Sequence, residues 1–145
     1  MYNTILSVHS YLAYAALGLL FIATINAIFG LTSKGLFKSK DRSISLFALI
    51  VCHMQLLAGL ILYFVSEKFE QWSLLGMKIM KNDELRQLLV EHPLTNIIAL
   101  VLITIGWSKH KKEESNNGKF KKIAIFYTLG LLLLLLMVPY NQWLS

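Results

Sequence analysis

The sequence predicts an all-α fold, an integral membrane bundle of four helices that run alternately up and down. Hydrophobic residues make up 56% of the 145 residues and the mean hydropathy is +0.58. A soluble domain of this size cannot bury so much apolar surface. Most of it falls in blocks close to the length of about 20 residues that crosses a bilayer. None of the blocks shows the alternation of a membrane β-barrel strand.

We predict membrane helices over residues 7–31, 45–66, 93–108 and 123–140, an interfacial segment over 67–92, and a single domain over 1–145. The first helix is interpreted as a retained anchor, since no basic stretch or small-residue cleavage site marks it as a signal peptide. The segment 67–92 mixes apolar and charged residues, as interfacial segments do. Asn82 is expected to cap a helix there. Pro93 is expected either to kink that helix or to begin a new one.

Positive charge is shared unevenly among the links between these helices. Ten of the fourteen Lys and Arg lie between the first two helices or between the last two, and the middle link combines the other four with five acidic residues. The positive-inside rule therefore places both basic links in the cytoplasm and both termini outside, in the cytoplasmic (inner) membrane. Anionic headgroups of the lipid bilayer can neutralise the net charge of +6, so this charge does not indicate a nucleic-acid partner.

Three of the predicted helices carry a stripe of small and polar residues at helical spacing. Such residues let membrane helices approach one another, so the stripes are expected to face the bundle interior. His53 lies one residue off its stripe and is expected to face a flank or a neighbouring helix, while His110 is expected to be solvated among lysines. The stripes are His9, Ala13, Ala16, Leu20, Ala23, Ala27 and Gly30; Ser45, Ala48, Cys52, Gln55, Gly59, Leu62 and Ser66; and His92, Asn96, Ala99, Ile103, Gly106 and His110.

His9 and His92 form the most informative pair of polar residues. An ionisable residue inside a membrane helix is costly, which favours a functional role, although either histidine alone could be a wetted interfacial residue. In an up-down bundle the first and third helices run parallel, commonly on a diagonal. Two inward histidines at a similar level could then provide opposed axial ligands to a haem iron. Arg86 or Lys81 could meet the haem propionates.

Three stretches, HSYLAYAALGLL, CHMQLLAGLILYF and EHPLTNIIALVLITIG, resemble helices of small four-span bacterial membrane proteins labelled cytochrome b-like. The similarity covers nearly the whole chain. It implies haem b, electron transfer, and a quinone or a redox protein as partner. By position, the resemblance gives His9, His53 and His92 the role of candidate haem ligands, two of which would bind the iron.

Two other classes of function stay open. The chain could be a non-catalytic accessory or assembly subunit of a larger membrane complex, or a homo-oligomer, which its small size and small-residue stripes also fit. It could instead be a non-haem metal or proton-handling membrane protein that uses the same three histidines. The glycine loops and nucleophile motifs of common soluble enzymes are absent, and the sequence leaves open whether the protein is an enzyme.

Overall fold

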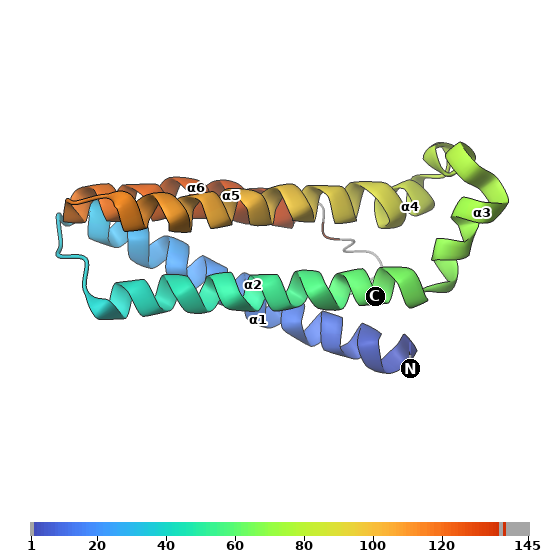
Figure 1. The fold of residues 1–145 in the computed structure, drawn as a ribbon, viewed down its shortest axis with the longest axis horizontal. Coiled ribbons are helices and arrows are strands. Elements are labelled where there is room, and N and C mark those ends of the chain that lie inside the picture. Colours follow the sequence, from blue (N-terminus) through green and yellow to red (C-terminus); the bar gives the residue numbers. More distant parts are fainter. Residues whose placement is uncertain (1, 137, 139–145) are drawn as a thin grey trace.

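The computed structural model describes residues 2–136 and 138 of the chain. Every regular element in this part of the chain is a helix, which confirms the all-α prediction. The longest are α1 (Tyr2–Thr32), α2 (Ser39–Val65), α5 (His92–Lys112) and α6 (Asn116–Leu136). They lie along the long axis of the molecule, and each runs opposite to the one before it (Figure 1).

Short helices form the connection at one end of the bundle (Figure 1). They are η1 (Glu67–Glu70), α3 (Gln71–Leu75), η2 (Gly76–Lys81), α4 (Asp83–Arg86) and the π-helical turn η3 (Gln87–Glu91). Asn82 is the N-cap of α4, because its side-chain oxygen accepts a hydrogen bond from the backbone N–H of Leu85 at 3.1 Å. The predicted cap is therefore confirmed. Pro93 lies in the first turn of α5, which follows α4 and η3 without a break.

The helices extend beyond the apolar stretches that predicted them. Helix α2 begins at Ser39 and not at residue 45, and α6 begins at Asn116 and not at residue 123. Hydropathy marks the part of a helix that faces hydrocarbon, whereas backbone hydrogen bonding continues into the basic turns beyond it. At the start of α2, the Asp41 carboxylate accepts a hydrogen bond from the Lys38 N–H at 2.8 Å. The predicted end of the fourth helix, 137–140, lies outside the described residues apart from Val138.

Around the bundle, α1 packs mainly on α2 and α6, and α5 packs on α6 and α2. Helices α1 and α5 therefore face each other across one diagonal, and α2 and α6 across the other. The buried Tyr127 hydroxyl spans the second diagonal and donates to the Ser45 carbonyl at 2.8 Å. Between α5 and α6, a Cβ on Gly130 would lie 2.5 Å from Cγ1 of Ile103, so only glycine permits this close approach.

Residues of the three predicted stripes make up much of the interior. This confirms that the stripes face inward. The fully or nearly buried members are Ala16, Leu20, Ala23 and Ala27 on α1, Ser45, Ala48 and Cys52 on α2, and Ala99, Ile103, Gly106 and His110 on α5.

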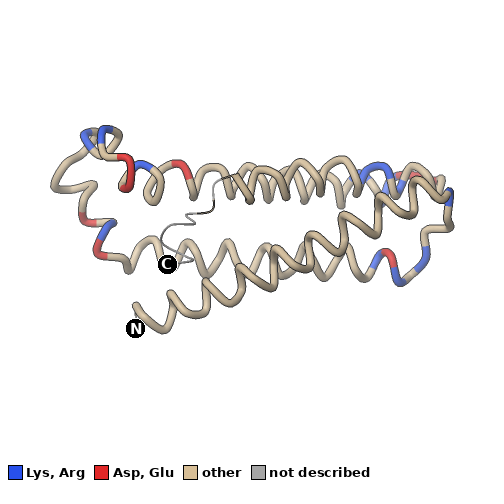
Figure 2. Tube along the Cα trace, turned by 180° about the vertical axis from the view of Figure 1, so that it is seen from behind, with Lys and Arg blue, Asp and Glu red and all other residues tan. Residues whose placement is uncertain are grey.

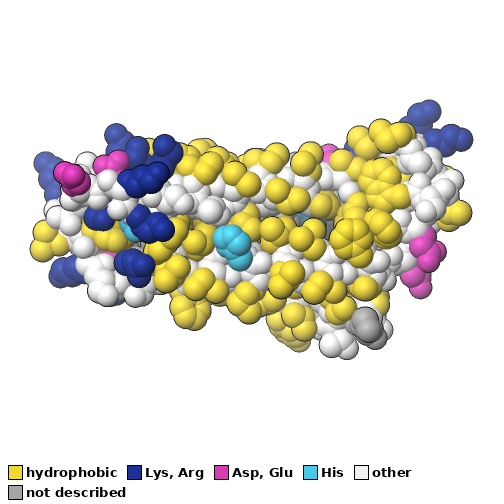
Figure 3. Space-filling model, viewed as in Figure 1, with side chains coloured by type: hydrophobic (Ala, Val, Ile, Leu, Met, Phe, Trp, Pro, Cys, Tyr) yellow, Lys and Arg dark blue, Asp and Glu magenta, His cyan; other side chains and the backbone are white. Residues whose placement is uncertain are grey.

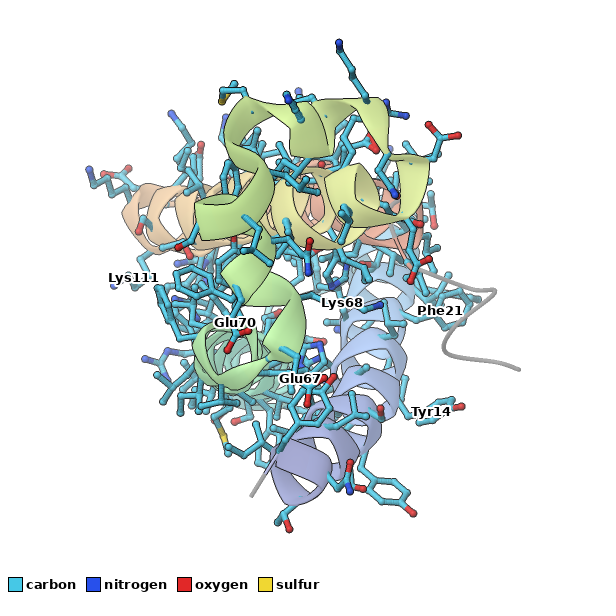
Figure 4. All side chains as sticks on the ribbon, turned by 90° about the vertical axis from the view of Figure 1, so that its right-hand side faces the viewer. Tyr14, Phe21, Glu67, Lys68, Glu70 and Lys111 are labelled. Atoms are coloured by element: carbon cyan, nitrogen blue, oxygen red, sulfur yellow. The ribbon has the colours of Figure 1, made fainter. Side chains whose placement is uncertain are left out.

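The outer surface is apolar along the middle of the bundle and charged at its two ends (Figures 2 and 3). Large apolar side chains such as Phe47 and Phe64 are exposed there, and Tyr14 projects from α1 away from the other helices (Figure 4). Among the described residues, α1, α2 and the helical stretch Asp83–Lys112 are long and apolar enough to cross a membrane. These features are compatible with a multi-pass membrane protein.

Candidate functional site

The fold brings His9 of α1 and His92 of α5 together across the bundle diagonal. Their ring centroids lie 6.4 Å apart and their ring planes are nearly perpendicular, at 87°. Both residues begin the inward stripe of their helix, which explains why both point to the interior. The pair lies toward the end of the bundle that carries the short helices 67–91.

A cavity of about 390 Å³ surrounds this pair, with walls from α1, α2 and α5 and from the end of α6. Gln55, Gly59 and Asn96 line it beside the two histidines. Gly59 makes room for the His9 ring, because a Cβ at that position would lie 3.0 Å from Cε1 of His9. The small residues of the stripes therefore provide space as well as close helix packing.

Several polar atoms at this cavity are buried without a hydrogen-bond partner among the described residues. They are Nδ1 of His9, Oε1 of Gln55 and Oδ1 of Asn96. The Asn96 amide nitrogen lies 3.2 Å from Nε2 of His92, which ties the second histidine to its own helix. An unsatisfied buried polar atom costs about 1–3 kcal/mol. All three belong to residues that line the cavity.

The separation of the two imidazoles suits ligation of one metal ion between them. A metal–imidazole bond of about 2.0 Å on each side, together with the radius of each ring, places the two centroids about 6 Å apart. The observed 6.4 Å is also an ordinary distance for an edge-to-face ring pair. The spacing of the two rings therefore leaves room for one metal ion between them.

A π-helical turn immediately precedes His92 and sets its position. The His92 N–H bonds to the Gln87 carbonyl, as the wider turn requires. Pro93 has no N–H, so the Leu89 carbonyl loses its usual helical donor. The Tyr63 hydroxyl of α2 replaces that donor at 2.9 Å, and Nε1 of Trp72 donates to the Tyr63 oxygen at 2.8 Å. Such π turns occur frequently at functional sites.

His53, the third candidate ligand, does not line this cavity. Its side chain is exposed on the outside of α2, and Nδ1 donates to the Leu49 carbonyl at 2.8 Å. The structure thus brings two of the three candidate histidines together and leaves His53 apart from them.

The expectation that His110 is solvated is wrong. Its side chain is 2% exposed, Nδ1 donates to the Trp107 carbonyl at 2.5 Å, and its ring packs against Trp107 and Phe37. His110 is the last member of the inward stripe of α5. The helical spacing of His110 therefore predicted its burial, whereas the neighbouring lysines wrongly suggested that it is solvated.

The cations near the cavity differ from those that the sequence suggested. Arg86 is held by Asp83 at 3.0 Å, by Glu91 at 3.4 Å and by the Met80 carbonyl at 2.9 Å. Lys81 is exposed and does not line the cavity. Lys68 does line it, with its ammonium 2.8 Å from a Glu84 oxygen. No signal in the sequence distinguishes Lys68 from the other charged residues of segment 67–92.

Comparisons with protein-family models, with curated proteins and with solved structures find no match for this chain.

Proposed function

We propose that the chain is a membrane cytochrome b-like protein that binds haem b through His9 and His92 and transfers single electrons. The observation that carries this proposal is the proximity of the two imidazoles, whose ring centroids lie 6.4 Å apart, beside a cavity of about 390 Å³. In this proposal α1, α2, α5 and α6 each cross the cytoplasmic (inner) membrane. The two basic links lie in the cytoplasm, and the short helices and both termini lie outside.

The number of protein donors favours haem over another metal centre. The described residues contain no group of three or more His, Cys, Asp or Glu that could hold a metal ion. Zinc sites take three or four protein donors. A porphyrin brings its own four nitrogens and asks the protein for axial ligands alone, which two opposed histidines can supply. We infer that His53, being outside the cavity, is not one of them.

Each residue of the site has a distinct part in this proposal. Bound haem b would supply one-electron redox chemistry, with a quinone or a partner redox protein as the electron-exchange partner. His9 and His92 would hold the iron, and the Asn96 amide nitrogen lies 3.2 Å from Nε2 of His92. Gly59 leaves space for the His9 ring. Lys68 lines the cavity as an ion pair with Glu84 at 2.8 Å, and its ammonium would be shared with a haem propionate.

An absorption spectrum of the detergent-purified protein, expressed with ample haem, tests this function. We expect a Soret band that shifts on reduction. His9→Ala and His92→Ala should each lose it, because each removes one axial ligand. His53→Ala is the matched control and should keep the band, since its ring does not line the cavity. Absence of a Soret band in the wild type, or a band that depends on His53 and not on His9, would contradict the proposal.

A second candidate function is proton handling at the same cavity. The unpartnered Nδ1 of His9, Oε1 of Gln55 and Oδ1 of Asn96 favour it, because such atoms can hold a short chain of ordered waters. Protein without a Soret band, but with proton uptake into liposomes that is lost in His9→Ala, would favour this alternative over haem.

A further inference from the structure

A second cavity lies at the opposite end of the bundle, where the α1–α2 and α5–α6 connections meet. It has a volume of about 310 Å³. Four of its lining residues are cationic, and they come from three parts of the chain: the start of α2, the end of α5 and the start of α6. The lining residues are Phe37, Lys38, Ser39, Arg42, His110, Lys111 and Lys119. We call this the basic cavity, and the positive charge at this end is visible in Figures 2 and 3.

A row of three packed rings contacts three of the four cations of the basic cavity. Trp107 packs on His110 at 4.4 Å, and His110 packs on Phe37 at 5.3 Å, between ring centroids. The Arg42 guanidinium lies 5.3 Å and the Lys111 ammonium 5.9 Å from the Trp107 ring, and the Lys119 ammonium lies 5.9 Å from the Phe37 ring. In each contact the negative face of the aromatic ring attracts the positive charge beside it. Arg42, Lys111 and Lys119 are therefore positioned by aromatic rings in or beside the cavity wall.

The nearby carboxylates of the described residues form no ion pair with these cations. The Asp41 oxygens accept hydrogen bonds from the Asn26 amide at 2.9 Å and from the Lys38 backbone N–H at 2.8 Å. Glu113 lies 3.8 Å from Lys122. In the part of the chain that the structure describes, no acidic residue lines the basic cavity and none of its four cationic residues forms an ion pair.

We propose that the basic cavity binds a phosphate group, either of an anionic phospholipid headgroup or of free phosphate. The mutual repulsion of its cations is relieved when an anion enters. Arg42 presents the planar fork that suits a phosphate, and the lysines add point charges. Ser39 is the first residue of α2, so the positive end of the helix dipole also lies at this cavity. Basic cavities between membrane helices at the cytoplasmic surface are known to bind lipid headgroups.

The test measures lipid retained by the full-length protein in detergent, by native mass spectrometry, with phosphatidylglycerol and phosphatidylcholine as probes at equal mole fraction. The wild type is expected to retain phosphatidylglycerol preferentially. The double variant Arg42→Gln with Lys119→Gln should bind it at least about tenfold more weakly. The control Lys40→Gln with Lys121→Gln removes the same charge from exposed residues outside the basic cavity and should match the wild type.

Two further measurements keep the result interpretable. Far-ultraviolet circular dichroism checks that each variant is helical, and Arg42→Lys, which keeps the charge without the fork, should show an intermediate loss. Inorganic phosphate is then titrated against bound phosphatidylglycerol: displacement identifies free phosphate as an accepted ligand, and retention identifies the lipid as the occupant. Equal loss in the variant and control pairs, or equal retention of the two lipids by the wild type, would overturn the proposal.

Discussion

His9, His53, His92 and His110 have four different surroundings in one bundle. His9 and His92 are half-buried against each other, His53 is exposed on the surface of α2, and His110 is enclosed by aromatic rings. Successive residues on a helix are turned by about 100°. A shift of one position, from Cys52 to His53, therefore moves a side chain from the interior to the outer surface. The direction in which each histidine side chain points from its helix therefore decides whether it can contribute to an interior site.

Adding a single carbon atom at Gly59 tests whether this residue determines the position of the His9 ring. In Gly59→Ala the new Cβ would lie 3.0 Å from Cε1 of His9, so the ring has to move. Overpacking of this kind costs about 1–3 kcal/mol, and we expect haem binding to be about tenfold weaker by titration of the apoprotein.

Gly18→Ala is the matched control for that experiment. A Cβ at Gly18 meets nothing within 4 Å, and alanine is the better helix former. Haem binding should therefore be unchanged in this variant. Equal affinities of the two alanine variants would show that Gly59 does not determine the place of the His9 ring.

At the scale of elements, the most consequential feature is the π turn between α4 and α5. It reconciles Pro93 with a continuous helix, because the Leu89 carbonyl that proline leaves without a donor accepts from Tyr63 of α2. Trp72 adds a hydrogen bond from the short helices to the same hydroxyl. Three elements thus fix the backbone that carries His92. The sequence allowed Pro93 either to kink the preceding helix or to begin a new one. In the structure Pro93 lies in the first turn of α5, within an uninterrupted helical stretch.

Removal of the Tyr63 hydroxyl tests this arrangement. Tyr63→Phe leaves the Leu89 carbonyl and Nε1 of Trp72 without their partner, so we expect a loss of about 1–3 kcal/mol in the free energy of unfolding. Tyr11→Phe is the control, because that side chain is 74% exposed, and it should change stability little. Denaturant titration in detergent, followed by circular dichroism, measures both.

A double-mutant cycle identifies the proline as the cause. Pro93→Ala restores an N–H that can donate to the Leu89 carbonyl, so Tyr63→Phe should cost less in the Pro93→Ala background than in the wild type. The same cost in both backgrounds would mean that Tyr63 stabilises the protein through a contact other than Leu89.

At the scale of the whole molecule, the directions of the long helices and the distribution of basic residues point to the same membrane topology. The long helices alternate in direction (Figure 1), the middle of the surface is apolar (Figure 3), and the end with the α1–α2 and α5–α6 connections holds most of the basic residues (Figure 2). The opposite end carries ion pairs such as Lys68 with Glu84. This distribution supports the proposed topology, in which lipid covers the apolar surface.

Single cysteines in a Cys52→Ala background test that topology, since Cys52 is the only cysteine of the chain. Ser73 and Ser115 are exposed at opposite ends of the bundle. In right-side-out vesicles, a membrane-impermeant maleimide should label Ser73→Cys at once and Ser115→Cys only after the membrane is permeabilised. Labelling of both, or of Ser115→Cys alone, would contradict the proposed orientation.

The sequence by itself was enough for the helical class, the approximate helices, the inward stripes and the expectation that His9 and His92 face the interior. These features depend on hydrophobicity and on the fixed turn per residue, which are local properties. It was also enough for the Asn82 cap, which depends on a contact three residues away.

Tertiary structure decided which residues meet. The His9–His92 contact, the donation from Tyr63 to Leu89, the burial of His110 and the presence of Lys68 at the cavity all join parts of the chain that lie far apart. The rotation and level of one helix against another set such contacts, through close approaches like that of Gly130 to Ile103. No local pattern encodes those two quantities, so the histidine pair could be expected from the sequence but its 6.4 Å geometry could not.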